Sequence, residues 1–256
     1  MPRPARARAG RGPDMRTAGD AAAAGTTAVP ASQTLSRGLR TLELLAEAPE
    51  GRTTAEIAGE LGVHRSIAYR ILRTLEEHSL VVRDAAGRFQ PGPGLASLAR
   101  GVAPRLQTAA LPELTAVAAE LQMTAFIAVW DRRHCVTLVA VEPPHGEGTL
   151  VQRPGSRHRF DAGAPGIAIQ SALTEARWDR LAPGEPYREE SRIAAAAGYA
   201  VSRDEVIPGV SSVAAPVPVR GQLPAALAVV YLRSDRPVEE IGVRVAEAAR
   251  AVASVL

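Results

Sequence analysis

Residues 53–91 read TTAEIAGELGVHRSIAYRILRTLEEHSLVVRDAAGRFQP, and this stretch decides the fold of the first part of the chain. Thr53 and Glu56 have the Ser/Thr-x-x-Glu spacing of a capping box, which predicts a helix that starts there. Gly62 follows at a position where the chain must turn sharply, and a residue without Cβ tolerates the positive φ of such turns. A second helix is then predicted from about His64 to about Glu77.

One face of this second helix is predicted to pack on a core. Its apolar residues recur at the i, i+3, i+4, i+7 spacing of a buried stripe, and they are Ala68, Ile71, Leu72 and Leu75. The side chains left facing outward are Arg65, Ser66, Tyr69, Arg70 and Arg73. Arginine can bond guanine O6 and N7, or a phosphate, through two parallel hydrogen bonds. Serine and tyrosine hydroxyls can donate to phosphate oxygens, so the outward face suits a DNA major groove.

A short hairpin is predicted after this helix. Its strands would span residues 80–82 and 87–90 around a turn at residues 84–87, with Arg83 and Arg88 flanking the tip. A capped helix, a turn, an arginine-bearing helix and a hairpin, in this order, are typical of a winged helix-turn-helix that binds DNA. The alternative is a solvated amphipathic helix followed by an ordinary hairpin.

The overall charge supports this prediction less than the isoelectric point of about 9.6 implies. All thirty basic residues are arginine, and the formal net charge is only +3. That excess lies within residues 1–31, so the remainder of the chain is neutral. Residues 64–75, by contrast, carry three arginines and no acid. The prediction of DNA binding therefore rests on where charges lie, because electrostatic steering depends on the local field.

Several function classes lack support in the sequence. A single cysteine, Cys135, excludes an internal disulfide, and the five histidines lack metal-ligand spacing, so no metal and no cofactor are expected. No nucleophile elbow, phosphate-binding loop or dinucleotide fingerprint is present, and an enzyme is not expected. No apolar run approaches the roughly 18–20 residues of a membrane span. The first thirty residues lack the apolar core of a secretion signal, and we expect a soluble cytoplasmic protein.

The chain is expected to divide into four segments, at residues 1–31, 32–93, 94–111 and 112–256. The first is rich in Arg, Ala, Gly and Pro, lacks periodicity, and is expected to be disordered. The second is the winged domain, whose first helix is predicted over residues 35–46 with Leu39, Leu42 and Leu45 inward. The third is a helical linker, within a helical stretch at residues 95–122 predicted to be broken by Pro104 and Pro112.

The fourth segment mixes strands with helices. Apolar and β-branched runs predict strands at residues 124–130, 135–142, 149–152, 212–219 and 225–232, the last two as a hairpin around residues 220–222. Helices are predicted at residues 163–173 and 238–255. The second of these has a stripe formed by Ile241, Val245, Ala249 and Val252. A mostly antiparallel sheet with helices makes this an α+β domain.

From about Ser32 to its C-terminus the chain resembles the IclR family of bacterial transcription regulators. The stretch GVHRSIAYRILRTLEEHSLV, residues 62–81, is similar to that family's recognition helix and entry to the wing. The stretch GYAVSRDEVIPGVSSVAAPV, residues 198–217, is similar to the lead into its central sheet. The resemblance implies a GAF-like effector-binding and oligomerisation domain at residues 112–256. It also implies a homodimer or homotetramer that binds a double-stranded DNA operator under the control of a small organic effector.

The resemblance places the effector pocket at six positions, Gly163, Ala164, Ser202, Ser212, Ala228 and Val230. Family members that bind small carboxylates tend to have an acid at the position of Ser202, a cysteine at Ser212 and serines at the last two. Leaving a buried carboxylate without polar partners is costly. Our hypothesis is therefore a larger, less polar ligand, with Ser202 and Ser212 as the remaining hydrogen-bonding groups.

Three alternatives stay open. The chain between Trp178 and Ile193 is shorter than the family's usual region, which allows a degenerate sensor domain that only dimerises and binds no effector. A constitutive or architectural DNA-binding protein is the second alternative. The third concerns the sign of regulation: the residues do not distinguish a repressor from an activator, and repression is our working expectation.

Overall fold

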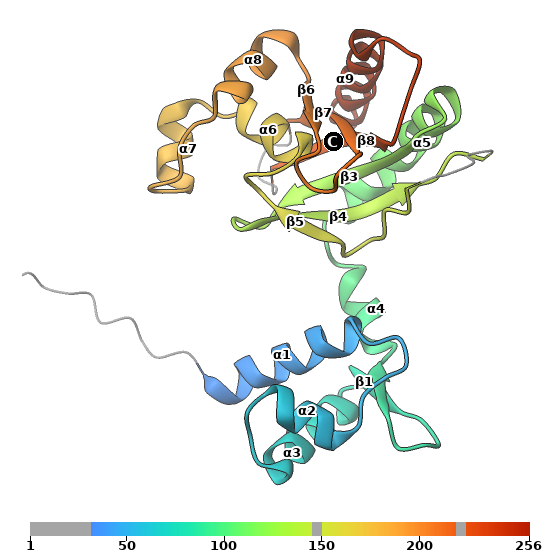
Figure 1. Ribbon diagram of the computed structural model, residues 1–256, viewed down its shortest axis with the longest axis vertical. Coiled ribbons are helices and arrows are strands. Elements are labelled where there is room, and N and C mark those ends of the chain that lie inside the picture. Colours follow the sequence, from blue (N-terminus) through green and yellow to red (C-terminus); the bar gives the residue numbers. More distant parts are fainter. Residues whose placement is uncertain (1–31, 145–149, 219–223) are drawn as a thin grey trace, which may run out of the picture. The chain divides into compact units, whose positions relative to one another are not determined.

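The computed structural model describes residues 32–144, 150–218 and 224–256. These fall into two compact units, one ending at Leu95 and the other beginning at Ala96 (Figure 1). Each unit has its own buried core. The short helix α4 (Gly94–Ala99), none of whose residues is buried, carries the chain across the boundary. Over the described ranges, the helices are too short or too polar to cross a membrane.

The first unit is a winged helix-turn-helix. It consists of α1 (Gln33–Ala46), α2 (Thr54–Glu60), α3 (Arg65–Glu77), β1 (Val81–Arg83) and β2 (Phe89–Pro91). The capping box at the start of α2 is confirmed: the Thr53 side chain accepts from the Glu56 amide, and the Glu56 carboxylate accepts from the Thr53 amide. Gly62, between α2 and α3, has φ +61, the positive value expected for that turn.

The predicted inward face of α1 is wrong at one position. Leu45 is buried and Leu42 half-buried, but Leu39 is 55% exposed. The buried residues of α1 are Gly38, Thr41, Leu44 and Leu45. The buried stripe of α1, which packs against α3 and β2, is therefore shifted by about one residue from the stripe that the leucines predict. Small side chains in this stripe let α1 pack closely against these two elements.

The wing forms as an antiparallel pair in which Val82 faces Gln90. Its strands begin one or two residues later than predicted. The Asp84 side chain accepts from the Arg88 amide at 2.8 Å, and the Gly87 amide donates to the Asp84 carbonyl at 3.0 Å, which closes the turn. Arg52 adds an isolated bridge to Phe89, so the wing is anchored to the loop that precedes α2.

The second unit begins with α5 (Pro104–Leu121), and Leu106 and Ala110 of this helix are fully buried in the core of the unit. Pro104 is the first residue of this helix, where a missing amide hydrogen costs nothing. The prediction that Pro112 breaks the helix is wrong. Pro112 lies on the exposed side of α5, so water can reach the carbonyl of Thr108 that loses its amide donor.

A six-stranded antiparallel sheet forms the centre of the second unit, in the order β5-β4-β3-β8-β7-β6. Its strands are β3 (Thr124–Trp130), β4 (His134–Val141), β5 (Arg157–Arg159), β6 (Ala200–Arg203), β7 (Ser211–Val217) and β8 (Ala225–Tyr231). The strand predicted at residues 149–152 is wrong for residues 150–152, and β5 takes the edge position instead. Residue 149 and the predicted turn at residues 220–222 lie outside the described residues.

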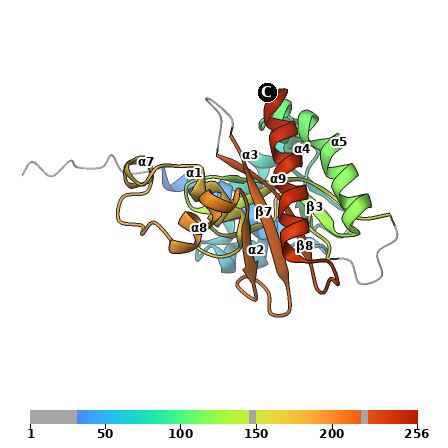
Figure 2. The same cartoon turned by 90° about the horizontal axis from the view of Figure 1, so that it is seen from above.

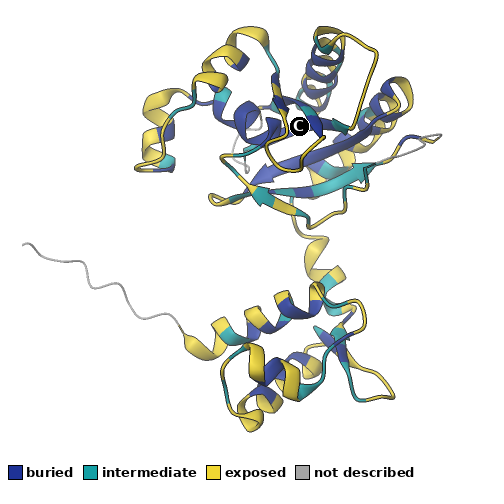
Figure 3. Ribbon diagram, viewed as in Figure 1, coloured by how far each residue is buried: buried dark blue, intermediate teal, exposed yellow. Residues whose placement is uncertain are grey.

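Helices cover both faces of this sheet (Figures 1 and 2). On one side lie α5 and α9 (Val238–Ser254), and on the other lie α6 (Ala164–Ser171), α7 (Glu175–Leu181) and α8 (Glu189–Ala197). Alternate residues of β3 point to opposite faces of the sheet. Ile127 packs in the core under α5 and α9, and Phe126 packs in the core under α6, α7 and α8. All seven residues of β3 are buried, in agreement with its continuous apolar sequence (Figure 3).

Candidate functional site

The outward side chains of α3 occupy one continuous arc of the helix. Ala68, Ile71, Leu72 and Leu75 are all buried, as the apolar stripe predicts. At about 100° per residue, the five predicted DNA contacts on α3 fall within an arc of about 140° on the other side. These residues, Arg65, Ser66, Tyr69, Arg70 and Arg73, are all exposed. The structure therefore brings them together on one accessible face.

The N-terminus of α3 is capped by a residue that sequence reasoning missed. The His64 ring nitrogen Nδ1 accepts from the Ser66 amide at 3.3 Å and lies 2.9 Å from the Ser66 hydroxyl oxygen. Histidine is an uncommon cap, so its sequence position alone carried little signal. The Ser66 hydroxyl thus already has a partner, while Arg65, in the first turn, is in no ion pair with a described residue.

Arg70 lies at the margin of the arc, beside α1. It lines a groove of about 550 Å³ together with α1 residues that include Leu35 and Gly38, and with Ile67 of α3. Leu35 is 63% exposed and Ile67 36% exposed, so this margin is apolar as well as basic. Tyr69, 52% exposed, lies nearer the centre of the arc.

Arg73 is paired with an acid of its own helix. Its Nε donates to the Glu77 carboxylate at 3.2 Å, and this contact raises the pKa of the Arg73 guanidinium above its ordinary value. Both side chains are more than 60% exposed. An exposed pair of this kind contributes little to stability because solvent screens it, so a phosphate can compete for Arg73.

The two wing arginines differ in their surroundings. Arg83 is exposed, and its guanidinium carbon lies 5.6 Å from the centre of the Phe89 ring. Arg88 is half-buried and donates to backbone carbonyl oxygens of the loop before α2, at 2.9 Å to Glu50 and 2.7 Å to Gly51. Its Nη2 also lies 3.5 Å from the Glu56 carboxylate. Arg83 is thus free to reach a ligand, whereas Arg88 holds the wing to the helix-turn-helix.

In the second unit, the structure gathers all six predicted effector positions on the sheet face covered by α6. Ser202 of β6, Ser212 of β7 and Val230 of β8 face one another across neighbouring strands. Ala228 lies two residues from Val230 on the same face and is fully buried. The Ala164 amide donates to the Ser202 hydroxyl at 3.0 Å, which joins the start of α6 to this row.

Gly163 lies where the two edges of the sheet approach each other. A Cβ on this residue would lie 3.0 Å from Cγ2 of Val206, after β6, and 3.6 Å from Nε2 of His158, on β5. Gly163 has φ +91, which favours glycine. Its amide donates to the Glu205 carboxylate at 2.8 Å. Sequence reasoning missed Glu205, because this contact joins residues 42 positions apart.

Two buried polar atoms near this row lack a hydrogen-bond partner among the described residues. They are the Ser212 hydroxyl oxygen and His158 Nε2. Burial, together with the neighbouring His134, lowers the pKa of His158 and favours its neutral form. An unpaired buried hydroxyl is costly unless a ligand or water meets it. Ser212 is therefore the group here that most favours a ligand.

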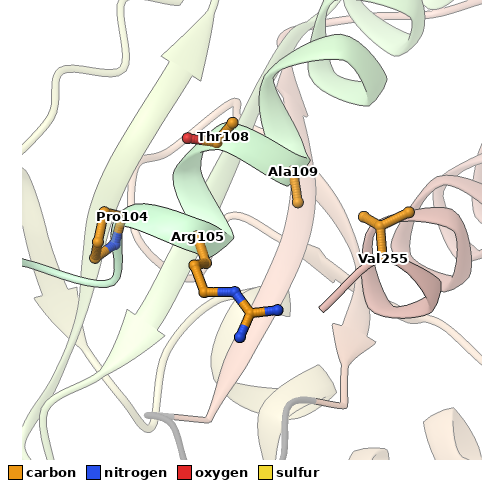
Figure 4. Close-up of a pocket in the computed structure, with 5 residues that line it drawn as sticks. All are labelled: Pro104, Arg105, Thr108, Ala109 and Val255. Atoms are coloured by element: carbon orange, nitrogen blue, oxygen red, sulfur yellow. The ribbon is translucent and has the colours of Figure 1, made fainter.

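Two further hollows in this unit contain none of the predicted residues. Figure 4 shows a groove of about 410 Å³ lined by Pro104, Arg105, Thr108, Ala109 and Val255, in which Arg105 Nη2 donates to the Leu256 carbonyl at 2.8 Å. A smaller cavity, of about 340 Å³, lies at the stacked rings of Trp130, Phe160 and Trp178. Within the described residues, no three metal-ligating side chains gather at one place.

Comparison with known proteins agrees with this architecture. The sequence model of the IclR helix-turn-helix domain matches residues 34–85, which contain α2, α3 and β1. The HTH-type transcriptional regulator Rv1719 of Mycobacterium tuberculosis is 28% identical over 197 residues, covering 72% of this chain and 76% of that protein.

Solved structures extend the similarity over both units. The IclR transcriptional regulator of Alicyclobacillus acidocaldarius is 27% identical, with a TM-score of 0.72 over 88% of this chain and 99% of that one. An IclR homologue of Microbacterium hydrocarbonoxydans, solved with 4-hydroxybenzoate, shares the fold at 21% identity, with a TM-score of 0.74 over 87% and 98% of the two chains. The winged first unit and the helix-covered sheet of this chain are therefore similar to those of the IclR family, whose members are DNA-binding transcriptional regulators and not enzymes.

Proposed function

We propose that the protein represses transcription in the cytoplasm, by binding an operator through α3 in a manner that a small organic molecule controls. The observation that carries the DNA-binding half is the arc of Arg65, Ser66, Tyr69, Arg70 and Arg73, opposite the buried stripe of the same helix. A helix with one exposed polar face and one buried apolar face can enter the major groove while its apolar face stays packed on the core of the domain.

Within the arc, the arginines have different proposed roles. Arg65 or Arg70 reads guanine, and such a contact provides about 1–3 kcal/mol of discrimination between bases. Arg73, Ser66, Tyr69 and the wing residues Arg83 and Arg88 contact phosphates and fix the register. Arg88 reaches DNA only if it exchanges some of its contacts to Glu50 and Gly51.

We propose a homodimer or homotetramer as the active form. Two copies of α3 would enter successive major grooves of a pseudo-palindromic operator, with half-sites roughly 34–36 Å apart or a multiple of that spacing. Effector binding to the second unit would change operator affinity through a coupling free energy of about 1–3 kcal/mol.

The proposed effector site is the row of Ser202, Ser212, Ala228 and Val230 together with the start of α6. The unpaired Ser212 hydroxyl and the apolar neighbours favour a ligand with few polar groups. The 4-hydroxybenzoate in the Microbacterium hydrocarbonoxydans relative supports a small organic molecule as the class of effector. Tight binding of glyoxylate or pyruvate in isothermal titration, with no binding of aromatic or hydrophobic metabolites, would contradict this choice.

One experiment tests both parts of the proposal, operator binding and its control by an effector. The protein is footprinted on DNA upstream of its own gene, and metabolites are then screened for release or enhancement of the complex. A protected, roughly symmetric site that a metabolite releases is the expected result. A protected site that responds to no metabolite would favour a sensor domain that only dimerises, and sequence-indifferent binding would favour an architectural protein.

A further inference from the structure

The start of α6 is already occupied by an acid of the chain itself. The first amides of a helix lack intrahelical partners and, with the helix dipole, they attract anions. Here the Gly163 amide donates to the Glu205 carboxylate at 2.8 Å, and the Ala164 amide donates to the Ser202 hydroxyl at 3.0 Å. A ligand carboxylate that approaches these amides would therefore meet the Glu205 carboxylate in its way.

Glu205 is held in place by an arginine from another segment. Nη2 of Arg188, which lies between α7 and α8, is 3.4 Å from the Glu205 carboxylate. Nη1 of Arg188 donates to the Asp161 carbonyl at 2.9 Å, and the Arg188 amide donates to the buried Gln170 side chain of α6 at 3.0 Å. The Arg188 side chain is 17% exposed and that of Glu205 is 29% exposed. Because Arg188 is also fixed by Asp161 and Gln170, it positions Glu205 against α6.

The remaining surroundings offer little to a second negative charge. Phe126, Ala214 and Ala228 pair across β3, β8 and β7, and all three are buried on the face that α6 covers. The Ser212 hydroxyl is the polar atom of this row that has no partner among the described residues. Arg188, the cation that contacts Glu205, is already paired with it and with Glu190.

We propose that Glu205 determines the charge of the effector: it makes the site select an uncharged, mostly apolar molecule with one polar group that meets Ser212. Two carboxylates at one site repel each other, and only one can hold the α6 amides. Neutral ligands avoid this repulsion and bury their apolar surface against Ala228 and Val230. The inference rests on the proposed effector site and specifies its class of ligand.

The test compares Glu205→Gln with Glu190→Gln in the full chain. A glutamine at position 205 still accepts from the Gly163 amide but carries no charge. Glu190 pairs with the same arginine, is 54% exposed, and has no contact with Gly163, so it is the matched control. Matched acid and amide pairs serve as probes: benzoate with benzamide, and 4-hydroxybenzoate with 4-hydroxybenzamide. Affinities are measured by isothermal titration, and thermal unfolding checks that each variant is folded.

We expect the wild-type protein and Glu190→Gln to bind each amide at least tenfold more tightly than the matching acid. In Glu205→Gln the acid should gain about tenfold, so that the preference disappears. Ser212→Ala should weaken binding of the amides severalfold, which places the probe at this row.

Three results would overturn the inference, and the last of them can be told apart from the first two. If the acids bind the wild-type protein as tightly as the amides, or if Glu205→Gln leaves the preference unchanged, Glu205 does not set the charge, but the effector site stands. If neither member of either pair binds any of the proteins, both the inference and the proposed sensor role fail, while DNA binding is unaffected.

Discussion

Nη2 of Arg88, the residue that precedes β2 of the wing, donates to the carbonyl oxygen of Gly51 at 2.7 Å. The two residues are 37 positions apart, and Gly51 precedes the helix-turn-helix. With the second contact to Glu50, Arg88 ties the wing to the loop that leads into α2. A positive charge on the wing therefore has an internal role in addition to its proposed contact with DNA.

Replacing Arg88 by alanine should destabilise the first unit by about 1–3 kcal/mol, because hydrogen bonds that involve a charged group contribute about 1.5–3 kcal/mol and this one is partly exposed. Urea unfolding of the full chain can resolve this effect. Both tryptophans, Trp130 and Trp178, lie in the second unit, so their fluorescence should report no change, while circular dichroism should show earlier loss of helix. Arg83→Ala is the control and should leave both signals as in the wild type. A fluorescence transition that moves with Arg88→Ala would contradict the assignment.

Arg70→Ala should weaken binding to the operator more than binding to unrelated DNA. The expected loss on the operator is about 1–3 kcal/mol, since a bidentate contact to guanine is removed. Fluorescence anisotropy with the two DNA duplexes at one salt concentration measures the difference. Arg83→Ala should instead weaken both alike and reduce the slope of log affinity against log salt by about one. Equal losses on the two duplexes for Arg70→Ala would assign Arg70 to phosphate.

Glu77→Gln should strengthen DNA binding modestly. The Glu77 carboxylate accepts from Arg73 at 3.2 Å, and it also adds a negative charge near a phosphate backbone. Its removal frees Arg73 and should increase affinity about two- to fivefold at low salt, with a smaller gain as salt screens the charges. Glu47→Gln, at the C-terminal end of α1, is a control for the general loss of one acid. A fall in affinity for Glu77→Gln would mean that the ion pair positions Arg73 for DNA.

The second unit should lose stability as the pH falls toward 5. Burial lowers the pKa of His158 in the folded protein, so the unfolded chain takes up the proton first. The stability that this histidine contributes is therefore fully present above its unfolded pKa, about 6.5, and is lost below it. Tryptophan fluorescence in urea at pH 7.5 and pH 5 measures the change in the second unit. His158→Gln should reduce that pH dependence, and His78→Gln, in the first unit, should not. A pH dependence that survives in His158→Gln would exclude this histidine as its source.

The sequence predicted those features whose contacts lie close along the chain. The capping box of Thr53 and Glu56 spans three residues, and the buried stripe of α3 follows from helical periodicity alone. The α+β class and the winged first unit are confirmed for the same reason. Leu39 was placed on the wrong face because leucine spacing cannot give the phase of a stripe whose buried members include Gly38 and Thr41.

Features that depend on distant contacts could not be predicted. The edge strand β5 is three residues long and reads Arg-His-Arg, which carries no strand signal until His158 pairs with Cys135. The contact of Glu205 with Gly163 joins segments 42 residues apart, and that of Arg188 with Glu205 joins segments 17 apart. No local sequence pattern distinguishes Glu205 or Arg188 from other charged residues. The position of the Glu205 carboxylate at the start of α6 is therefore known only from the folded structure.

The central claim is that α3 reads the operator. The most direct test is to measure the operator affinity of the variants Arg65→Ala, Arg70→Ala and Arg73→Ala, singly and together. We expect each single change to weaken specific binding and the triple change to abolish the footprint, with thermal unfolding close to that of the wild type because all three side chains are exposed. A triple variant that protects the same operator with unchanged affinity would contradict the account.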